Sequence, residues 1–200
     1  MRVIIYPHNY VELISAILCT CVFLYKPSVI NRWFVWFLWV TVLVEFSAKF
    51  MLNMLDFKMV MYNLFTGIEF IFYAILIGRI AETPSLKKVV KTCLWVFIPF
   101  WLLNFLAIQG EFVYNTYTAT LCGVLLCLLC LLYYYDILRA DFTQKNRTPK
   151  LLIVSAIFLF YAGSVNMYAS FNKLLIKAPA YLTKLYMLIV NNLNVVLYGL

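Results

Sequence analysis

Carboxyl groups set inside long apolar runs are the residues of this sequence most able to do chemistry. Glu69 lies near the middle of one run, and Tyr62, Thr66 and Tyr73 follow its helical face at spacings of three and four residues. Glu45 lies in a neighbouring run. A charge is costly at membrane depth, so a carboxyl group kept there indicates a binding or proton-transfer site.

Amide and phenol groups in other apolar runs are expected at the same depth as the two carboxyl groups. We therefore predict a polar pocket inside a helix bundle, reachable from the non-cytoplasmic side, that binds a small polar solute or an ion. The predicted lining residues are Glu45, Glu69, Tyr73, Asn104, Asn166, Asn191 and Asn194.

A purely structural role is the alternative for each of these residues. Asn, Thr and Tyr also join membrane helices through hydrogen bonds of about 0.6 kcal/mol. Glu45 could pair with Lys49 one turn further along. Glu69 could be protonated and bonded to a tyrosine, because a charge is disfavoured away from water. Function is favoured for Glu69, since no basic residue lies within a helical turn of it.

The composition indicates which elements must position these side chains. Of 200 residues, 66% are hydrophobic and 12% are charged, whereas soluble domains are near half apolar and a quarter charged. This balance excludes secreted, cytosolic and disordered proteins and indicates a polytopic membrane protein. We expect residues 1–200 to form a single transmembrane domain.

Apolar runs separated by charge and proline predict seven membrane-spanning helices. An all-α bundle is required because a lipid-facing backbone must satisfy its own hydrogen bonds, and the runs are too long for barrel strands. Pro99, inside the fourth span, should kink that helix by freeing the carbonyl of Trp95. The predicted spans are residues 10–25, 33–50, 59–80, 92–109, 115–138, 151–171 and 182–200.

The distribution of basic residues predicts the orientation. Of the 16 Lys and Arg residues, ten fall on the side of the loops that follow spans one, three and five. The positive-inside rule places that side in the cytoplasm and the N-terminus outside, with the first span acting as a signal anchor. The net charge of +8 therefore reflects loops that contact the lipid bilayer and a possible cytoplasmic or membrane partner, and not nucleic acid.

The remaining motifs predict no chemistry. Cys127 and Cys130 form a C-x-x-C in a wholly apolar stretch, where inert packing is favoured over redox chemistry. His8, the single histidine, is expected to be solvated, so neither a metal nor another cofactor is expected. No phosphate loop or nucleophile elbow occurs, and Lys184 lies at the mouth of the last span, too shallow for a retinal linkage.

One short segment recurs in the sequence. FIFYA at residues 70–74 is followed by FLFYA at residues 158–162, in two predicted spans of opposite direction. Inverted repeats are typical of transporters, but five residues in an aromatic-rich chain are too few to establish one.

Four segments carry a family resemblance: YVELISAILC, VEFSAKF, YNLFTGIEFIFY and LNVVLYGL. They resemble a functionally uncharacterised family of bacterial multi-pass membrane proteins with about seven spans. The resemblance implies a helical bundle in the bacterial cytoplasmic membrane and assigns no catalytic residue.

Three functions remain open at this point. The leading hypothesis is a non-enzymatic, receptor-like or accessory bundle that binds a small polar solute or ion. The second is a proton- or cation-coupled transporter, in which Glu69 titrates as the pocket alternates between the two sides. The third, an intramembrane enzyme acting on lipid, is the least supported because the glutamates have no nucleophile or metal to serve.

Overall fold

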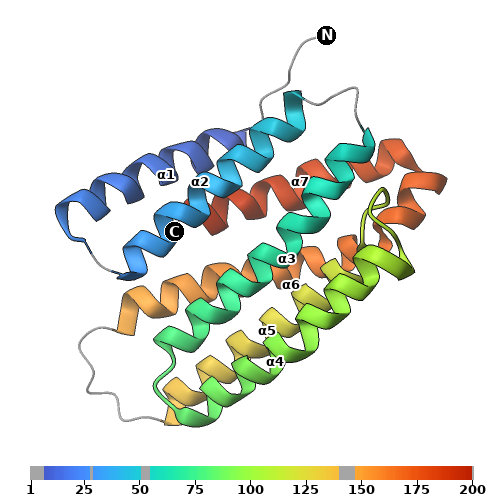
Figure 1. Ribbon diagram of the computed structural model, residues 1–200. Helices are drawn as coiled ribbons and strands as arrows, with labels where there is room; N and C mark the ends of the chain where they lie inside the picture. The colour runs from blue at the N-terminus through green and yellow to red at the C-terminus, as the bar shows by residue number, and fades with distance from the viewer. Residues whose placement is uncertain (1–6, 28, 51–54, 140–146, 200) are drawn as a thin grey trace.

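The computed structural model describes residues 7–27, 29–50, 55–139 and 147–199 (Figure 1). Every element in these ranges is helical, which confirms the predicted all-α bundle. The elements are α1 (Pro7–Tyr25), α2 (Val29–Phe50), α3 (Leu55–Ile80), α4 (Pro84–Leu103), the π-helical turn η1 (Asn104–Ile108), α5 (Thr116–Arg139), α6 (Arg147–Lys177) and α7 (Pro179–Gly199).

The lengths and surfaces of the helices are those of a membrane protein. Six of them are long and apolar enough to cross a bilayer, namely α1, α3, α4 with η1, α5, α6 and α7. Large apolar side chains cover the outside of the bundle, including Leu24, Trp36, Trp95 and Leu106. A soluble monomer rarely exposes so much contiguous apolar surface, whereas lipid accepts it.

Several helices begin at or next to a proline. Pro7, Pro84 and Pro179 are the first residues of α1, α4 and α7, and Pro149 lies in the first turn of α6. Proline is favoured there because the N–H it lacks has no partner in a first turn. Every helix except α5 begins before its predicted span, most clearly α4, which begins at residue 84 instead of 92, and α6 covers Arg147–Lys177 instead of 151–171. Hydropathy marks the apolar length of a helix and omits its polar ends.

Helix α3 lies at the centre of the bundle, packed against α2, α4, α5 and α6 (Figure 1). Helix α7 packs against both α6 and α1, and α1 packs against α2. These contacts close a ring of five helices, α1, α2, α3, α6 and α7. Helices α4 and α5 pack on the other side of α3, so the ring has its own interior.

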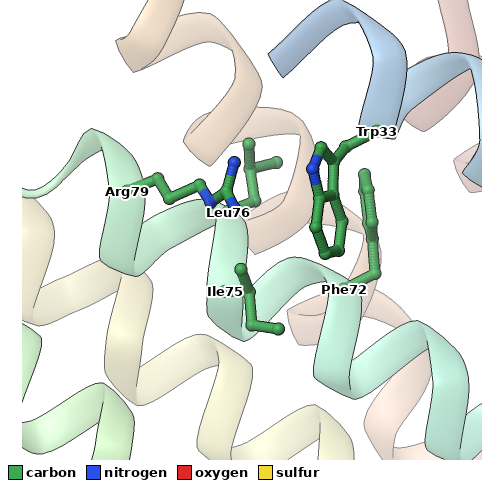
Figure 2. A pocket seen from close by; sticks show the side chains of 5 residues that line it. All are labelled: Trp33, Phe72, Ile75, Leu76 and Arg79. Carbon is green, nitrogen blue, oxygen red and sulfur yellow. The ribbon is translucent and has the colours of Figure 1, made fainter. Parts of the chain in front are cut away.

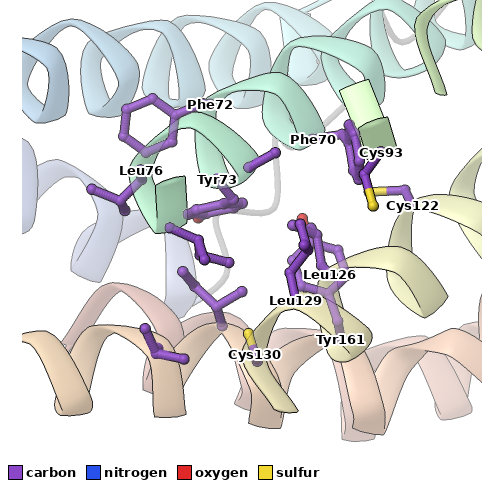
Figure 3. Close-up of a cluster of buried hydrophobic side chains, with 14 of the residues drawn as sticks. Phe70, Phe72, Tyr73, Leu76, Cys93, Cys122, Leu126, Leu129, Cys130 and Tyr161 are labelled. Atoms are coloured by element: carbon purple, nitrogen blue, oxygen red, sulfur yellow. The ribbon is translucent and has the colours of Figure 1, made fainter. Parts of the chain in front are cut away.

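An apolar core joins α3 to α4, α5 and α6 (Figure 3). The ring of Phe70 stacks on that of Phe97, with centroids 3.8 Å apart, and Leu126 is fully buried. Cys130 is buried in this core and Cys127 is half-buried at its edge, both as free thiols. Their surroundings are apolar, in keeping with the packing role expected for the C-x-x-C.

Gly67 allows α3 and α4 to approach closely. The side chain of Trp101 occupies the space that a Cβ atom at Gly67 would need, 2.2 Å from Trp101 Cε2. The indole N–H of Trp101 donates to the carbonyl of Asn63, with 3.1 Å between nitrogen and oxygen. Helix α4 continues through Pro99, and regular α geometry ends only at Leu103, where η1 follows.

Candidate functional site

Carboxyl groups from three helices of the five-helix ring lie within electrostatic range of one another or of the same tyrosines. Glu69 of α3 has Glu45 of α2 as its charged neighbour. Glu12 of α1 lies within electrostatic range of three tyrosines that also border Glu45 or Glu69, namely Tyr62, Tyr73 and Tyr198. Glu12 is buried, whereas Glu45 and Glu69 are half-buried. We call these three glutamates the carboxyl cluster.

Hydroxyl groups surround the carboxyl cluster. The phenol of Tyr161 lies next to Glu69, and its ring meets that of Tyr73 edge to face, with centroids 6.1 Å apart. Tyr73 is within hydrogen-bonding reach of Tyr198 on α7, and Tyr198 is within reach of Thr41 on α2. A hydroxyl group both donates and accepts, so this shell can solvate a carboxylate or a polar ligand.

Helix α7 turns two amide groups towards the same interior. Asn191 and Asn194 are 8% and 9% exposed, and Asn191 shares a helical face with Tyr198, seven residues further along. The buried Oδ1 of Asn191 has no hydrogen-bond partner within the part of the chain that the structure describes. An unpaired buried acceptor costs about 1–3 kcal/mol, so this position favours a ligand that donates hydrogen bonds.

Two contacts between helices place Asn191 at the depth of Glu69. The ring of Tyr161 meets Tyr73, and Leu193 of α7 packs against α6 two residues beyond Tyr161. A helix rises 1.5 Å per residue, so the Leu193 contact lies about 3 Å closer than Tyr161 to the end of the bundle where α1 and α3 begin. Asn191 comes two residues before Leu193 in α7 and lies about 3 Å closer again to that end. Glu69 lies about 6 Å from Tyr73 in the same direction, so the two depths agree.

Two of the predicted lining residues lie elsewhere. Asn166 is exposed on the outside of α6. Asn104 is buried in η1, where its Nδ2 donates to Gln109 Oε1 at 3.1 Å and to Thr118 Oγ1 at 2.8 Å. Of the other five predicted residues, Tyr73, Asn191 and Asn194 are buried, and Glu45 and Glu69 are half-buried.

Glu12 is absent from the predicted lining residues although it is 1% exposed. Helix α1 buries His8, Asn9, Glu12 and Ala16 and exposes Ile14. A polar stripe opposite an apolar face is the sequence signal that indicates an inward-facing Glu12. The expectation that His8 is solvated is wrong, because this stripe turns inward and leaves His8 only 4% exposed.

The connection from η1 to α5 is fastened to α3 by one buried side chain. Asn63 Nδ2 donates to the carbonyls of Glu111 and Val113 at 3.1 and 2.8 Å. Its Oδ1 accepts from the backbone N–H of Asn115 at 2.9 Å. Gly110 makes the reversal possible with a φ of 82°, a conformation that favours glycine.

The same connection borders the carboxyl cluster. The phenol of Tyr114 is an electrostatic neighbour of Glu69, and burial raises the pKa of Tyr114 well above its ordinary value, so the phenol stays protonated. Its ring packs on Phe171, with centroids 4.6 Å apart, and Asn172 Nδ2 donates to the Tyr114 carbonyl at 2.9 Å. The connection is therefore held between α3 and α6 at the polar end of the bundle.

The opposite end of the bundle carries a shallow apolar groove between α2 and α3 (Figure 2). The guanidinium of Arg79 lies over the ring of Trp33, 4.7 Å from its centroid. None of the predicted site residues lines this groove, whose walls are Trp33, Phe72, Ile75, Leu76 and Arg79.

The remaining acidic group of α5 has a structural partner. The carboxylate of Asp136 accepts a hydrogen bond from Thr83, the N-cap residue of α4. Across the described ranges, no three His, Cys, Asp or Glu side chains are grouped so that they could hold a metal ion.

Comparisons with protein-family models, with curated proteins and with solved structures found no match for this chain. Function is therefore argued from the carboxyl cluster and its surroundings.

Proposed function

We propose that this protein is a seven-span membrane protein that binds a small polar solute or ion in the interior of its five-helix ring. Helix α2 is 22 residues long and packs against α1 and α3, which supports counting it as the seventh span. The proposed location is the bacterial cytoplasmic membrane, with the N-terminus outside and the carboxyl cluster nearer the outer face.

The convergence of Glu45 and Glu69 is the observation that carries this proposal. Two acidic groups on different helices repel each other when both are ionised, and burial adds the cost of desolvation. A ligand that donates hydrogen bonds or carries positive charge would offset both costs. The half-buried state of Glu45 and Glu69 leaves part of each side chain accessible to such a ligand.

A receptor-like or accessory role follows from the short connections of the bundle. Only residues 81–83 separate α3 from α4, which leaves no room for a signalling domain there. The end of the bundle assigned to the cytoplasm is basic, with Arg79, Lys87, Arg139 and Lys150 at the helix ends. A cytoplasmic or membrane partner that contacts this rim would transmit the bound state.

The proposal is tested with the purified protein in lipid nanodiscs. Thermal unfolding is followed in the presence of a panel of small polar solutes and ions, because a ligand at 100 times its Kd stabilises the folded state by about 2.7 kcal/mol. At least one compound should stabilise the protein, and Glu69→Gln should abolish that effect. Glu111→Gln, the same change at an exposed loop position, should leave it intact.

Unchanged stability, unchanged ligand response and an unchanged cell phenotype for Glu69→Gln would together refute an interior site. A ligand response that Glu111→Gln removes equally would place binding outside the carboxyl cluster.

A proton- or cation-coupled transporter is the second candidate. The hydroxyl groups of Tyr73, Tyr198 and Thr41 follow one another from the carboxyl cluster towards the other end of the bundle. Beside Tyr73, the rings of Phe37 and Phe72 stack with centroids 3.9 Å apart, and the Phe37 ring lies 5.3 Å from that of Tyr73. A transporter that carried its solute past Tyr73 would have to move these rings during its cycle.

Flux measurements separate the two candidates. The protein is reconstituted into liposomes that carry a pH gradient, and uptake of each stabilising compound is measured. Uptake that Glu69→Gln abolishes would establish transport, whereas stabilisation without uptake would establish binding alone.

A further inference from the structure

The groove between α2 and α3 combines an apolar floor with a basic group at one end (Figure 2). Four of its lining residues follow one face of α3 at spacings of three and four residues, namely Phe72, Ile75, Leu76 and Arg79. Trp33 of α2 forms the facing wall. A helix rises 1.5 Å per residue, so Phe72 and Arg79 are about 10 Å apart along the axis of α3. The groove therefore covers about a third of a hydrocarbon core of about 30 Å.

Arg79 and Trp33 lie at the mouth of the groove. Arg79 is exposed next to the C-terminal end of α3, and its guanidinium lies 4.7 Å from the centroid of the Trp33 ring. Trp33 lies in the second turn of α2 and is 44% exposed. Tryptophan is enriched at the level of the lipid headgroups, and an arginine near a helix end extends to that level. We therefore expect the mouth at the headgroup level and Phe72 at the depth of the acyl chains.

The guanidinium of Arg79 keeps donors for a further partner. It has five N–H donors, and its contact with an aromatic face does not use them all. Within the described ranges Arg79 forms no ion pair, and the acidic side chains at this end have other partners. Glu82 pairs with Lys150 at 3.3 Å, and Asp136 accepts a hydrogen bond from Thr83. A guanidinium in this setting suits a phosphate group, which it can bind through two parallel hydrogen bonds.

An anionic phospholipid matches both parts of the groove. Its phosphate matches the guanidinium, and its acyl chain matches the apolar floor. A soluble anion would leave the floor without a partner, and a lipid without phosphate would leave the guanidinium without an acceptor. Further basic residues at this end of the bundle favour a headgroup with net negative charge over one that carries an ammonium group. They are Arg32, Lys87, Lys88 and Lys91.

We infer that this groove binds an anionic glycerophospholipid, with its phosphate on Arg79 and the upper part of one acyl chain along Ile75 and Leu76. The groove lies at the opposite end of the bundle from the carboxyl cluster, so the lipid site and the interior solute site can be tested separately. Six helices are long and apolar enough to cross a bilayer, which places such a lipid next to the groove.

The test uses delipidated protein in a non-ionic detergent. Dioleoyl phosphatidylglycerol, dioleoyl phosphatidylcholine, dioleoylglycerol and glycerol 3-phosphate are titrated separately at constant ionic strength, and the bound molecules are counted by native mass spectrometry. Phosphatidylglycerol should bind saturably and more tightly than the other three compounds. An excess of glycerol 3-phosphate should not displace it, because the free headgroup has no chain to fill the groove.

One pair of variants tests the guanidinium. Arg79→Gln should weaken phosphatidylglycerol binding about fivefold, the effect expected of one basic residue near anionic headgroups. Arg139→Gln is the matched control and should leave the affinity unchanged. Arg139 is also exposed at a helix end, with its guanidinium 4.5 Å from the centroid of the Tyr135 ring, but it does not line the groove.

A second pair of variants tests the apolar floor. Ile75→Phe adds volume inside the groove and keeps Arg79, so it should weaken phosphatidylglycerol binding as well. Leu128→Phe makes a similar change at an exposed position of α5 and should have no effect. Thermal unfolding without lipid verifies that each variant is folded. Should Ile75→Phe fail to fold, the comparison of Arg79→Gln with Arg139→Gln decides.

Four results would overturn the inference. Equal affinities for phosphatidylglycerol and phosphatidylcholine, or equal losses in Arg79→Gln and Arg139→Gln, would assign the binding to general surface charge. Displacement of the lipid by glycerol 3-phosphate would assign the guanidinium to a soluble anion. Unchanged affinity in a folded Ile75→Phe protein would show that the lipid binds outside the groove. A dimer of the lipid-free protein that Ile75→Phe dissociates would identify a second copy of the chain as the occupant.

Discussion

Asn63 shows how much structure a single amide can hold inside a membrane bundle. Its side chain makes hydrogen bonds to three backbone groups of the connection between η1 and α5, and it is 1% exposed. Asn63→Ala removes all three hydrogen bonds, which should destabilise the protein by about 2–3 kcal/mol. Unfolding in mixed micelles measures the effect. The control is Asn192→Ala, which removes an exposed bond within α7 and should cost less than about 0.5 kcal/mol.

Equal losses of stability in Asn63→Ala and Asn192→Ala would show that the Asn63 bonds do not fasten the connection.

Gly67 gives a second prediction at the residue scale. A methyl group there would overlap the ring of Trp101, which would have to move and would lose its bond to Asn63. Gly67→Ala should therefore lower the free energy of unfolding by about 1–3 kcal/mol. Gly199→Ala is the matched control, because the nearest atom is then 4.0 Å away, in Val11. A Gly67→Ala protein as stable as the control would contradict the close packing of α3 on α4.

Residue types inside apolar runs predicted part of the site. Glu45 and Glu69 stand out because a carboxyl group is rare at membrane depth. Asn104 and Asn166 share that depth, but only the structure shows that one is bonded to Gln109 and the other is exposed. Depth can be predicted from a sequence, whereas the direction in which an uncharged amide points depends on packing. Lys49, the partner considered for Glu45, lies outside the described side chains.

Helix starts provide a prediction at the element scale. Thr83 caps α4 by accepting from the backbone N–H of Leu86 at 3.4 Å, and it also donates to Asp136 of α5. Thr83→Ala should cost about 1 kcal/mol of stability, and Thr83→Ser should restore most of it because the hydroxyl is kept. Thr92→Ala, which removes an exposed bond to the carbonyl of Lys88, serves as the control. Equal stability of the Ala and Ser variants would show that the cap is not needed.

The apolar runs predicted where the helices lie, but they predicted only some of the helix faces that turn inward. The periods of α3 and α7 are visible because their polar residues recur every three or four positions. In α1 the polar residues lie in the first two turns, next to the proline at which the helix begins. In the sequence they therefore resemble a solvent-exposed segment that precedes the span. In the repeated segment, Tyr73 of the first copy packs against Tyr161 of the second.

At the scale of the whole molecule, orientation remains a prediction from charge. In a variant without native cysteines, Glu111→Cys in the α4–α5 connection should react with a membrane-impermeant maleimide added to intact cells. Ser85→Cys, in the first turn of α4 at the opposite end, should react only after the cells are permeabilised. The reverse pattern would place the N-terminus in the cytoplasm and the carboxyl cluster nearer the inner face.

The all-α class could be predicted from composition because a backbone in lipid has few ways to satisfy its hydrogen-bonding groups. The closed ring of helices could not, since the contact of α7 with α1 joins segments from opposite ends of the chain. That closure is held in part by the hydrogen bond from Ser15 Oγ to the Tyr198 carbonyl at 2.5 Å, and it completes the five-helix ring.

The central claim is that glutamates from different helices share one interior site. A double-mutant cycle on Glu45→Gln and Glu69→Gln, measured by unfolding at pH 8 without ligand, tests it most directly. Two carboxyl groups that repel each other should give a coupling free energy of about 0.5–3 kcal/mol, with the second substitution relieving less repulsion than the first. Effects that add within about 0.3 kcal/mol would contradict the claim, because independent sites behave in that way.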